Sequence, residues 1–183
     1  MKTSLNVTSF IFDKLCQFPN LIGLEVSDEK FSYAQIINYS LQTASVLKHL
    51  GAKKEAVGLI GQRSASSYFG VLGIVFSGCH YVPINLKYNL DKQVKIIQDS
   101  GIRILVGSSE DLASFSAALD EKSRESIEAW VIPYGQSNFT DEKWFSETSL
   151  DDISILKEPE SQNVSHLTYI MYTSGSTGHP KGV

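Results

Sequence analysis

The chain has 183 residues, of which 42% are hydrophobic and 20% are charged, and this composition provides enough apolar material for one globular domain with a packed core. It excludes an intrinsically disordered chain and a fibrous repeat. The formal net charge is −4 and the 16 basic residues are scattered rather than clustered, so a nucleic-acid-binding protein is not expected.

The first fifty residues predict a helix, a hairpin and a second helix. A short amphipathic helix is expected at the start of the chain and ends by Pro19. Two apolar runs flank the polar residues 27–30 and predict a β-hairpin. Ser32 followed three residues later by Gln35 is a capping-box pattern, which opens a helix running to about Leu50.

From residue 56 onward, short apolar strands alternate with helices. Strands are expected at 56–60, 80–84, 103–106 and 129–132, and helices at 66–76, 91–99 and 112–118. In the first of these helices, Gly70 and Gly73 predict close backbone packing, because glycine otherwise lowers helix stability. The strand–helix alternation predicts an α/β fold, a largely parallel sheet with helices on both faces and right-handed crossovers.

An irregular acidic connection is expected over residues 135–165. Between Asp141 and Glu160, seven acidic residues face two lysines and the sequence shows little periodicity, which indicates a solvated link. Residues 167–172 then predict a strand, and this strand leads into the last segment of the chain.

The cysteines, the histidines and the apolar runs bear on location and chemistry. Cys16 and Cys79 are not at metal-ligand spacing, so a reducing compartment without disulfides is expected. Cys79 is interpreted as a small buried hydrophobic residue rather than a nucleophile. His80 and His166 have no visible partner and predict structural roles. Neither a signal peptide nor a membrane span is predicted, since the longest nearly apolar run, 68–76, is too short. A cytoplasmic protein is therefore expected.

The end of the chain, residues 173–183, is rich in glycine and hydroxyl side chains and contains one lysine. Glycine permits a positive φ and a close approach of backbone amides to a ligand, while hydroxyls and a lysine offer hydrogen bonds and positive charge to phosphate oxygens. The segment predicts a phosphate-binding loop, and a flexible linker is the alternative. It is not a Walker A loop, because Pro180 occupies the second glycine position and Gly182 follows Lys181.

Residues 167–183, LTYIMYTSGSTGHPKGV, resemble the AMP-binding signature of the adenylate-forming superfamily, which includes acyl-CoA synthetases, luciferases and amino-acid adenylation domains. Residues 31–36 resemble the family's early helix start, 76–85 its Tyr-Val-Pro-Ile strand entry, and 93–110 is also family-like, so the resemblance covers roughly residues 20 to 183. The Tyr-Val-Pro-Ile wording and the Gly-Ser-Thr-Gly core are most similar to the N-terminal part of an amino-acid adenylation domain of nonribosomal peptide synthetases or a D-alanine–carrier protein ligase.

The sequence departs from the family pattern at a few positions. Cys79 and His80 stand where small residues are common, Asn85 replaces a common Asp, and Gln35 replaces a common Glu. The first three belong to a strand entry, so local repacking is expected rather than lost chemistry.

The resemblance implies an ATP-dependent ligase that activates a carboxylate, here an amino acid, as acyl-AMP with release of pyrophosphate. The acyl group would then pass to a phosphopantetheine or CoA thiol, with ATP and Mg²⁺ as cofactors and a carrier protein as partner. A nucleic-acid partner, a membrane partner and a protein-bound metal are not expected. The implied cofactor-binding residues, which would wrap the β- and γ-phosphates, are Thr173, Ser174, Gly175, Ser176, Thr177, Gly178 and Lys181.

The family's acid pocket, its adenine and ribose contacts and its catalytic lysine all follow this loop. No catalytic residue is therefore expected within residues 1–183, which are read as an N-terminal AMP-binding subdomain truncated just after the phosphate-binding loop. Such a piece is expected to be inactive alone and to self-associate through uncovered surface. The alternatives are an acyl-CoA synthetase and a non-catalytic, adenylation-like interaction module.

Overall fold

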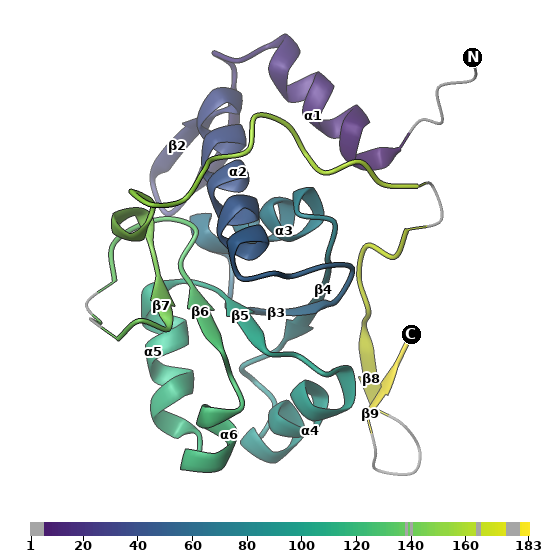
Figure 1. Ribbon diagram of the computed structural model, residues 1–183, viewed down its shortest axis with the longest axis vertical. Helices are drawn as coiled ribbons and strands as arrows, with labels where there is room; N and C mark the ends of the chain where they lie inside the picture. The colour runs from purple at the N-terminus through teal and green to yellow at the C-terminus, as the bar shows by residue number, and fades with distance from the viewer. Residues whose placement is uncertain (1–5, 138, 140, 164–165, 175–179) are drawn as a thin grey trace.

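The computed structural model describes residues 6–137, 139, 141–163, 166–174 and 180–183, with Thr148 and Ser174 described by their backbone alone. Figure 1 shows a central sheet flanked by helices, with an N-terminal helix and hairpin at one end and a C-terminal hairpin at the side. None of the helices in the described residues is long and apolar enough to cross a membrane.

The predicted helices and strands occur in the predicted order. The helices are α1 (Val7–Gln17), α2 (Tyr33–His49), α3 (Ala65–Phe76), α4 (Leu90–Ser100), α5 (Ser109–Ala118) and α6 (Glu121–Glu125), with a 3-10 turn η1 (Glu147–Ser149). The strands are β1 (Ile22–Val26), β2 (Glu29–Ser32), β3 (Ala56–Ile60), β4 (His80–Ile84), β5 (Ile104–Val106), β6 (Ala129–Val131), β7 (Trp144–Phe145), β8 (Tyr172–Ser174) and β9 (Pro180–Gly182). Of these elements, α6, β7, η1 and β9 are additional to the predicted ones.

Side-chain caps set where the helices begin. The predicted capping box of α2 is present: the Ser32 hydroxyl accepts from the Gln35 backbone at 3.3 Å, and the Gln35 side chain accepts from the Ser32 backbone at 2.9 Å. These bonds satisfy backbone groups that a helix end otherwise leaves unpaired. Gly101 ends α4 with φ +67°, a left-handed conformation that glycine adopts without a Cβ penalty.

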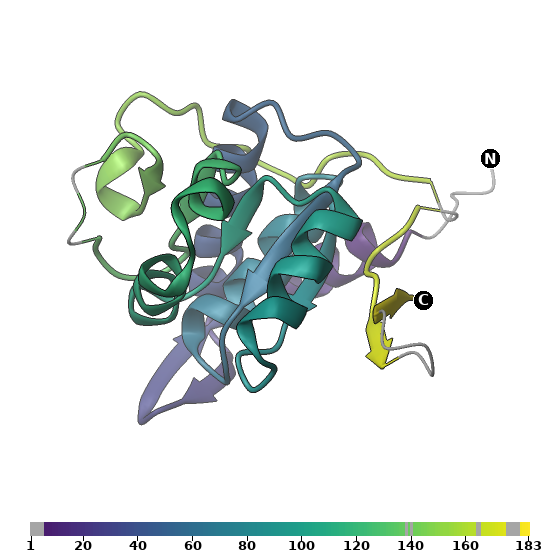
Figure 2. The same cartoon turned by 90° about the horizontal axis from the view of Figure 1, so that it is seen from below.

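The main sheet has five parallel strands in the order β4-β3-β5-β6-β7. Side chains alternate between its faces, as in any strand. On β5, Ile104 and Val106 join the cluster that contains α2 and α3 residues, while Leu105 joins the cluster that contains α4 and α5 residues. Helices therefore cover both faces, as Figure 2 also shows, and the predicted α/β class is confirmed.

Close packing of α3 explains its two glycines, as predicted. A Cβ on Gly73 would lie 2.5 Å from Thr43 Cβ and 3.0 Å from the Ser40 carbonyl oxygen, both on α2. A Cβ on Gly70 would meet Val106 and Leu59 side chains of the sheet. The α3 backbone is thus held between α2 and the sheet, at distances that exclude a side chain at Gly73.

Cys79 lies in the same core with no exposed surface, so its predicted packing role is confirmed. Cys16 is exposed, and both cysteines are free thiols.

Three predicted elements need correction. Helix α5 begins at Ser109 rather than 112, because Ser108 caps it and accepts from the Asp111 backbone at 3.2 Å. Regular structure interrupts the stretch 141–160, which was expected to have none: β7 extends the sheet, and Trp144 stacks on Trp130 with ring centroids 5.2 Å apart.

The third correction concerns residues 167–172, predicted as one strand. Only Tyr169 forms a bridge to β4, and the next strand begins at Tyr172. The Tyr81 backbone amide donates to the Thr168 carbonyl at 3.1 Å, and the Tyr81 carbonyl accepts from the Ile170 amide at 3.1 Å. The next residue of β4 that faces this edge is Pro83, which has no N–H to continue the ladder. The chain therefore leaves the sheet after Ile170.

Candidate phosphate-binding site

Residues 156–163 and 166–170, which we term the strap, lead from the helices to the candidate site. The Leu156 amide donates to the Ser45 hydroxyl at 2.8 Å, and the Glu160 amide donates to the Phe76 carbonyl at 2.8 Å. Lys48 forms an ion pair with Glu160. These bonds fix the strap to α2 and α3 before it reaches the edge of β4.

The strap ends in the antiparallel hairpin β8–β9. Thr173 lies opposite Lys181, Tyr172 opposite Gly182, and Ser174 opposite Pro180. Met171 and Val183 exchange two further backbone hydrogen bonds, of 3.0 and 2.9 Å. The segment 175–179 therefore connects two paired strands.

The hairpin brings part of the predicted site together. Thr173 and Lys181 are cross-strand partners and both are exposed. Ser174 is placed by its backbone at the end of β8. The remaining predicted residues, Gly175, Ser176, Thr177 and Gly178, lie outside the described residues.

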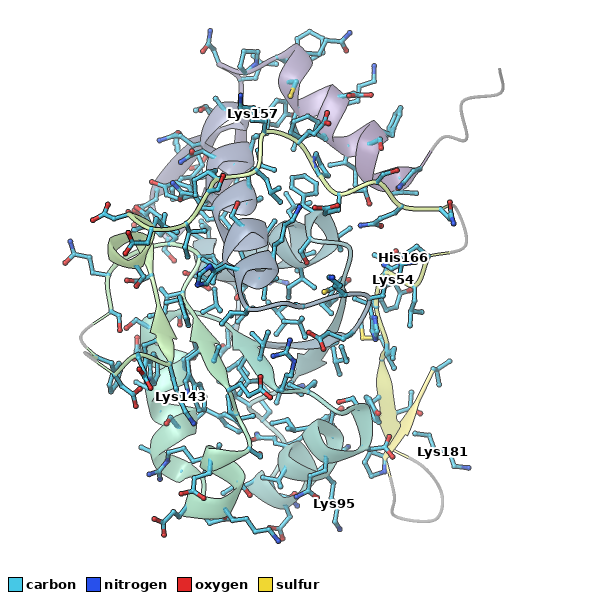
Figure 3. All side chains as sticks on the ribbon, viewed as in Figure 1. Lys54, Lys95, Lys143, Lys157, His166 and Lys181 are labelled. Carbon is cyan, nitrogen blue, oxygen red and sulfur yellow. The ribbon has the colours of Figure 1, made fainter. Side chains whose placement is uncertain are left out.

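Lys181 is the cationic group of this site. Its side chain extends from β9 away from the body of the molecule in Figure 3, and within the described part of the chain it has no ion pair or hydrogen bond to a side chain. Lys95 on α4 lies with Asp99 in a shallow concavity beside Pro180. An exposed ammonium opposite a threonine on the paired strand suits the oxygens of a phosphate chain.

Tyr172 attaches the hairpin to the body. Its hydroxyl donates to Asp99 Oδ2 at 2.5 Å, and burial together with this carboxylate raises the pKa of Tyr172 to about 12. The ring lies across Gly182, where a Cβ would sit 3.3 Å from Tyr172 Cζ. Sequence reasoning missed this pair, although Asp99 lies in a segment that it singled out as family-like and Tyr172 directly precedes the loop.

His80, on β4, and His166, on the strap, lie away from the hairpin. His80 Nδ1 and His166 Nε2 are buried and have no hydrogen-bond partner among the described residues. Burial, and then the nearby His166, lower the pKa of His80, so the neutral imidazole is favoured there. No cluster of three or more potential metal ligands occurs in the described ranges.

Comparisons with known proteins give one consistent family. The family model described as "AMP-binding enzyme" matches residues 12–183. Gramicidin S synthase 2 of Brevibacillus brevis is 30% identical over 171 residues, covering 90% of this chain and 3% of that protein. Nonribosomal peptide synthetase Ao415 of Arthrobotrys oligospora is 27% identical, covering 87% of this chain and 4% of that protein.

Among solved structures, the anthranilate CoA ligase AuaEII in complex with anthranoyl-AMP is similar in fold. Its TM-score is 0.82 at 24% identity, covering all of this chain and 35% of that one.

Proposed function

The chain belongs to the AMP-binding enzyme family, and from this membership we propose that it is the N-terminal part of an ATP-dependent ligase that activates a carboxylate as acyl-AMP. The curated relatives are far longer, since the chain spans 3% and 4% of the two named above. The proposal therefore concerns a larger enzyme, in which residues 1–183 form a partial AMP-binding subdomain. Relatives named as peptide synthetases favour an amino acid as the substrate.

One observation carries the proposal: the β8–β9 hairpin sets Thr173 directly opposite Lys181 at the base of the glycine- and hydroxyl-rich segment. In acyl-AMP formation the leaving group is pyrophosphate, and its negative charge grows as the bond to the α-phosphate breaks. A fixed lysine and hydroxyl donors stabilise that charge without having to reorganise during the reaction. We assign the β- and γ-phosphate contacts to Thr173, Ser174, Gly175, Ser176, Thr177, Gly178 and Lys181.

The cofactors of this reaction are ATP and Mg²⁺. Lys181 suits the phosphates of ATP, because it is exposed and forms no ion pair among the described residues. The described residues offer Mg²⁺ no cluster of carboxylates. The acceptor of the acyl group is a phosphopantetheine or CoA thiol, with a carrier protein as the partner in the first case.

The catalytic groups and the acid pocket are proposed to lie outside these residues. The 183-residue chain should then show no acid-dependent ATP–pyrophosphate exchange with any amino acid. The full product of its reading frame should show exchange with one or a few amino acids, and Lys181→Gln should lower that exchange by about 10-fold or more. Exchange by the 183-residue chain would contradict the assignment of the missing groups.

The same assay separates the alternatives. CoA-thioester formation with a simple carboxylic acid would instead identify an acyl-CoA synthetase. Absence of any exchange by the full product would favour a non-catalytic interaction module.

Exposed apolar side chains support a further part of the proposal, namely that the 183-residue chain self-associates. The compartment that we propose for it is the cytoplasm. Leu167, Tyr169 and Met171 are each between 45% and 49% exposed, and Val183 is 80% exposed. They lie beside the β4 edge and on the C-terminal hairpin, and apolar surface of this kind favours association. Light scattering should show a mass that rises with concentration, and a strictly monomeric chain at high concentration would refute this.

A further inference from the structure

We propose that Tyr172 and Asp99 are positioning residues for the phosphate-binding loop: their hydrogen bond fixes the β8–β9 hairpin to the last turn of α4 and thereby sets the direction of Lys181. The inference rests on the proposed function of the hairpin and adds to it two residues that make no contact with phosphate.

The hydrogen bond between Tyr172 and Asp99 links the hairpin to α4. Tyr172 Oη and Asp99 Oδ2 are 2.5 Å apart. Asp99 lies in the last turn of α4, so this bond joins the hairpin directly to the body of the molecule. A bond from a phenol to a carboxylate is charge-assisted and stronger than a neutral one. Its loss should therefore free the hairpin more than the loss of a neutral surface bond.

The ring and the hydroxyl have separate tasks. The Tyr172 ring packs with Ile170 against the cluster that contains Ile96 and Ile97 of α4. It fits there because Gly182 has no side chain beneath it. Apolar packing is non-directional, so it holds the hairpin near α4 without fixing its rotation. The hydrogen bond of the hydroxyl is directional, so it fixes the orientation of the hairpin relative to α4.

Strand alternation transmits this constraint to Lys181. Successive side chains of a strand point to opposite faces. Because Tyr172 faces α4, its neighbour Thr173 and the cross-strand partner Lys181 face away from α4, which agrees with their exposure and with the direction of Lys181 in Figure 3. Pinning Tyr172 to Asp99 therefore orients Thr173 and Lys181 together.

Amide hydrogen exchange measured by NMR on the 183-residue chain tests the anchor without any ligand. The reporters are the paired Met171 and Val183 amides. Tyr172→Phe and Asp99→Ala should each raise their exchange about 10-fold or more, and Asp99→Asn should raise it less, since the amide oxygen can still accept from the phenol. Unchanged exchange in both Tyr172→Phe and Asp99→Ala would overturn the inference.

Matched controls lie on the same helix or pack against the same cluster. Tyr88→Phe removes the hydroxyl of another partly buried tyrosine, and Asp91→Asn removes an exposed carboxylate from the first turn of α4. Both should leave the two amides unchanged. Loss of protection in these controls would show a general loosening of α4 and would also overturn the inference.

Binding of inorganic pyrophosphate then tests positioning as distinct from anchoring. Tyr172→Phe and Asp99→Ala should weaken pyrophosphate binding about 3- to 10-fold, with partial rescue in Asp99→Asn and no change in the controls. Faster exchange with unchanged pyrophosphate affinity would refute the positioning role. Failure of the unmodified chain to bind pyrophosphate would instead refute the proposed function, and the exchange data would still decide whether the bond anchors the hairpin.

Discussion

Substituting Gly73 by alanine should destabilise the fold although alanine is the better helix former. In a helix interior, Gly→Ala by itself stabilises by about 1 kcal/mol. Here the new Cβ would lie 2.5 Å from Thr43 Cβ, 2.6 Å from Thr43 Cγ2 and 3.0 Å from the Ser40 carbonyl oxygen. The Ser40 oxygen is backbone and Thr43 sits on the same helix, so α2 and α3 must separate to make room.

The magnitude follows from the balance of these two effects. Overpacking a well-packed interior costs about 1–3 kcal/mol, and separating two helices across a buried contact belongs to the upper part of that range. After the propensity gain, the free energy of unfolding should fall by about 1–2 kcal/mol. With a urea dependence of about 1–3 kcal/mol/M, the unfolding midpoint should fall by roughly 0.3–2 M.

Gly70→Ala is the matched comparison on the same helix. Its Cβ would meet Val106 Cγ1 at 2.9 Å and Leu59 Cδ1 at 3.0 Å, and both are side-chain ends that can rotate. The free energy of unfolding should therefore fall by only about 0–1 kcal/mol. Urea unfolding followed by the fluorescence of the buried Trp130 and Trp144 measures both variants. A Gly73→Ala protein as stable as Gly70→Ala would refute the packing account of α3.

Three further predictions concern stability and are checked by the same urea measurement. Ser32→Ala removes the capping box of α2 and should cost about 1 kcal/mol, whereas an unchanged midpoint would contradict the cap. Arg103→Gln should cost about 1–2 kcal/mol, because Arg103 is bonded to Glu55 at 2.8 Å and to two other acceptors; equal stability would show that solvent replaces these bonds. The hydrogen bond to Glu29, followed by burial, raises the pKa of Tyr134 to about 12. In the unfolded chain the pKa of a tyrosine is about 10. The raised pKa in the folded state therefore stabilises the fold at pH values below about 10, and this contribution is lost between about pH 10 and 12. The stability difference between the unmodified chain and Tyr134→Phe should therefore shrink from pH 9 to pH 12, and a constant difference would contradict it.

The sequence predicted the elements best where a local signal marks both ends. Strands β3 and β4 have the predicted bounds, since each is a short apolar run between polar or glycine residues. The start of α2 was predicted because its capping box lies within four residues. Strand β7 was missed, because its two residues pair with β6 and Trp144 stacks on Trp130, contacts that no local pattern contains.

The candidate site divides in the same way. Thr173 and Lys181 belong to one contiguous motif, so the sequence alone could indicate them. The Tyr172–Asp99 bond joins residues 73 positions apart, and only the packing of the hairpin on α4 brings them together. The bend after Ile170 depends likewise on Pro83 in a distant strand, which removes the donor that a longer strand would need.

The most direct test of the central claim is an NMR titration of the 183-residue chain with millimolar inorganic pyrophosphate. Phosphate contacts without a base pocket should give weak binding, with chemical-shift changes centred on Thr173, Ser174 and Lys181. Lys181→Gln should abolish these changes. Lys143 lies near β7, at the edge of the sheet opposite β4 (Figure 3), so Lys143→Gln should leave them in place. Shifts elsewhere, or shifts that persist in Lys181→Gln, would contradict the assignment of the β8–β9 hairpin as the phosphate-binding element.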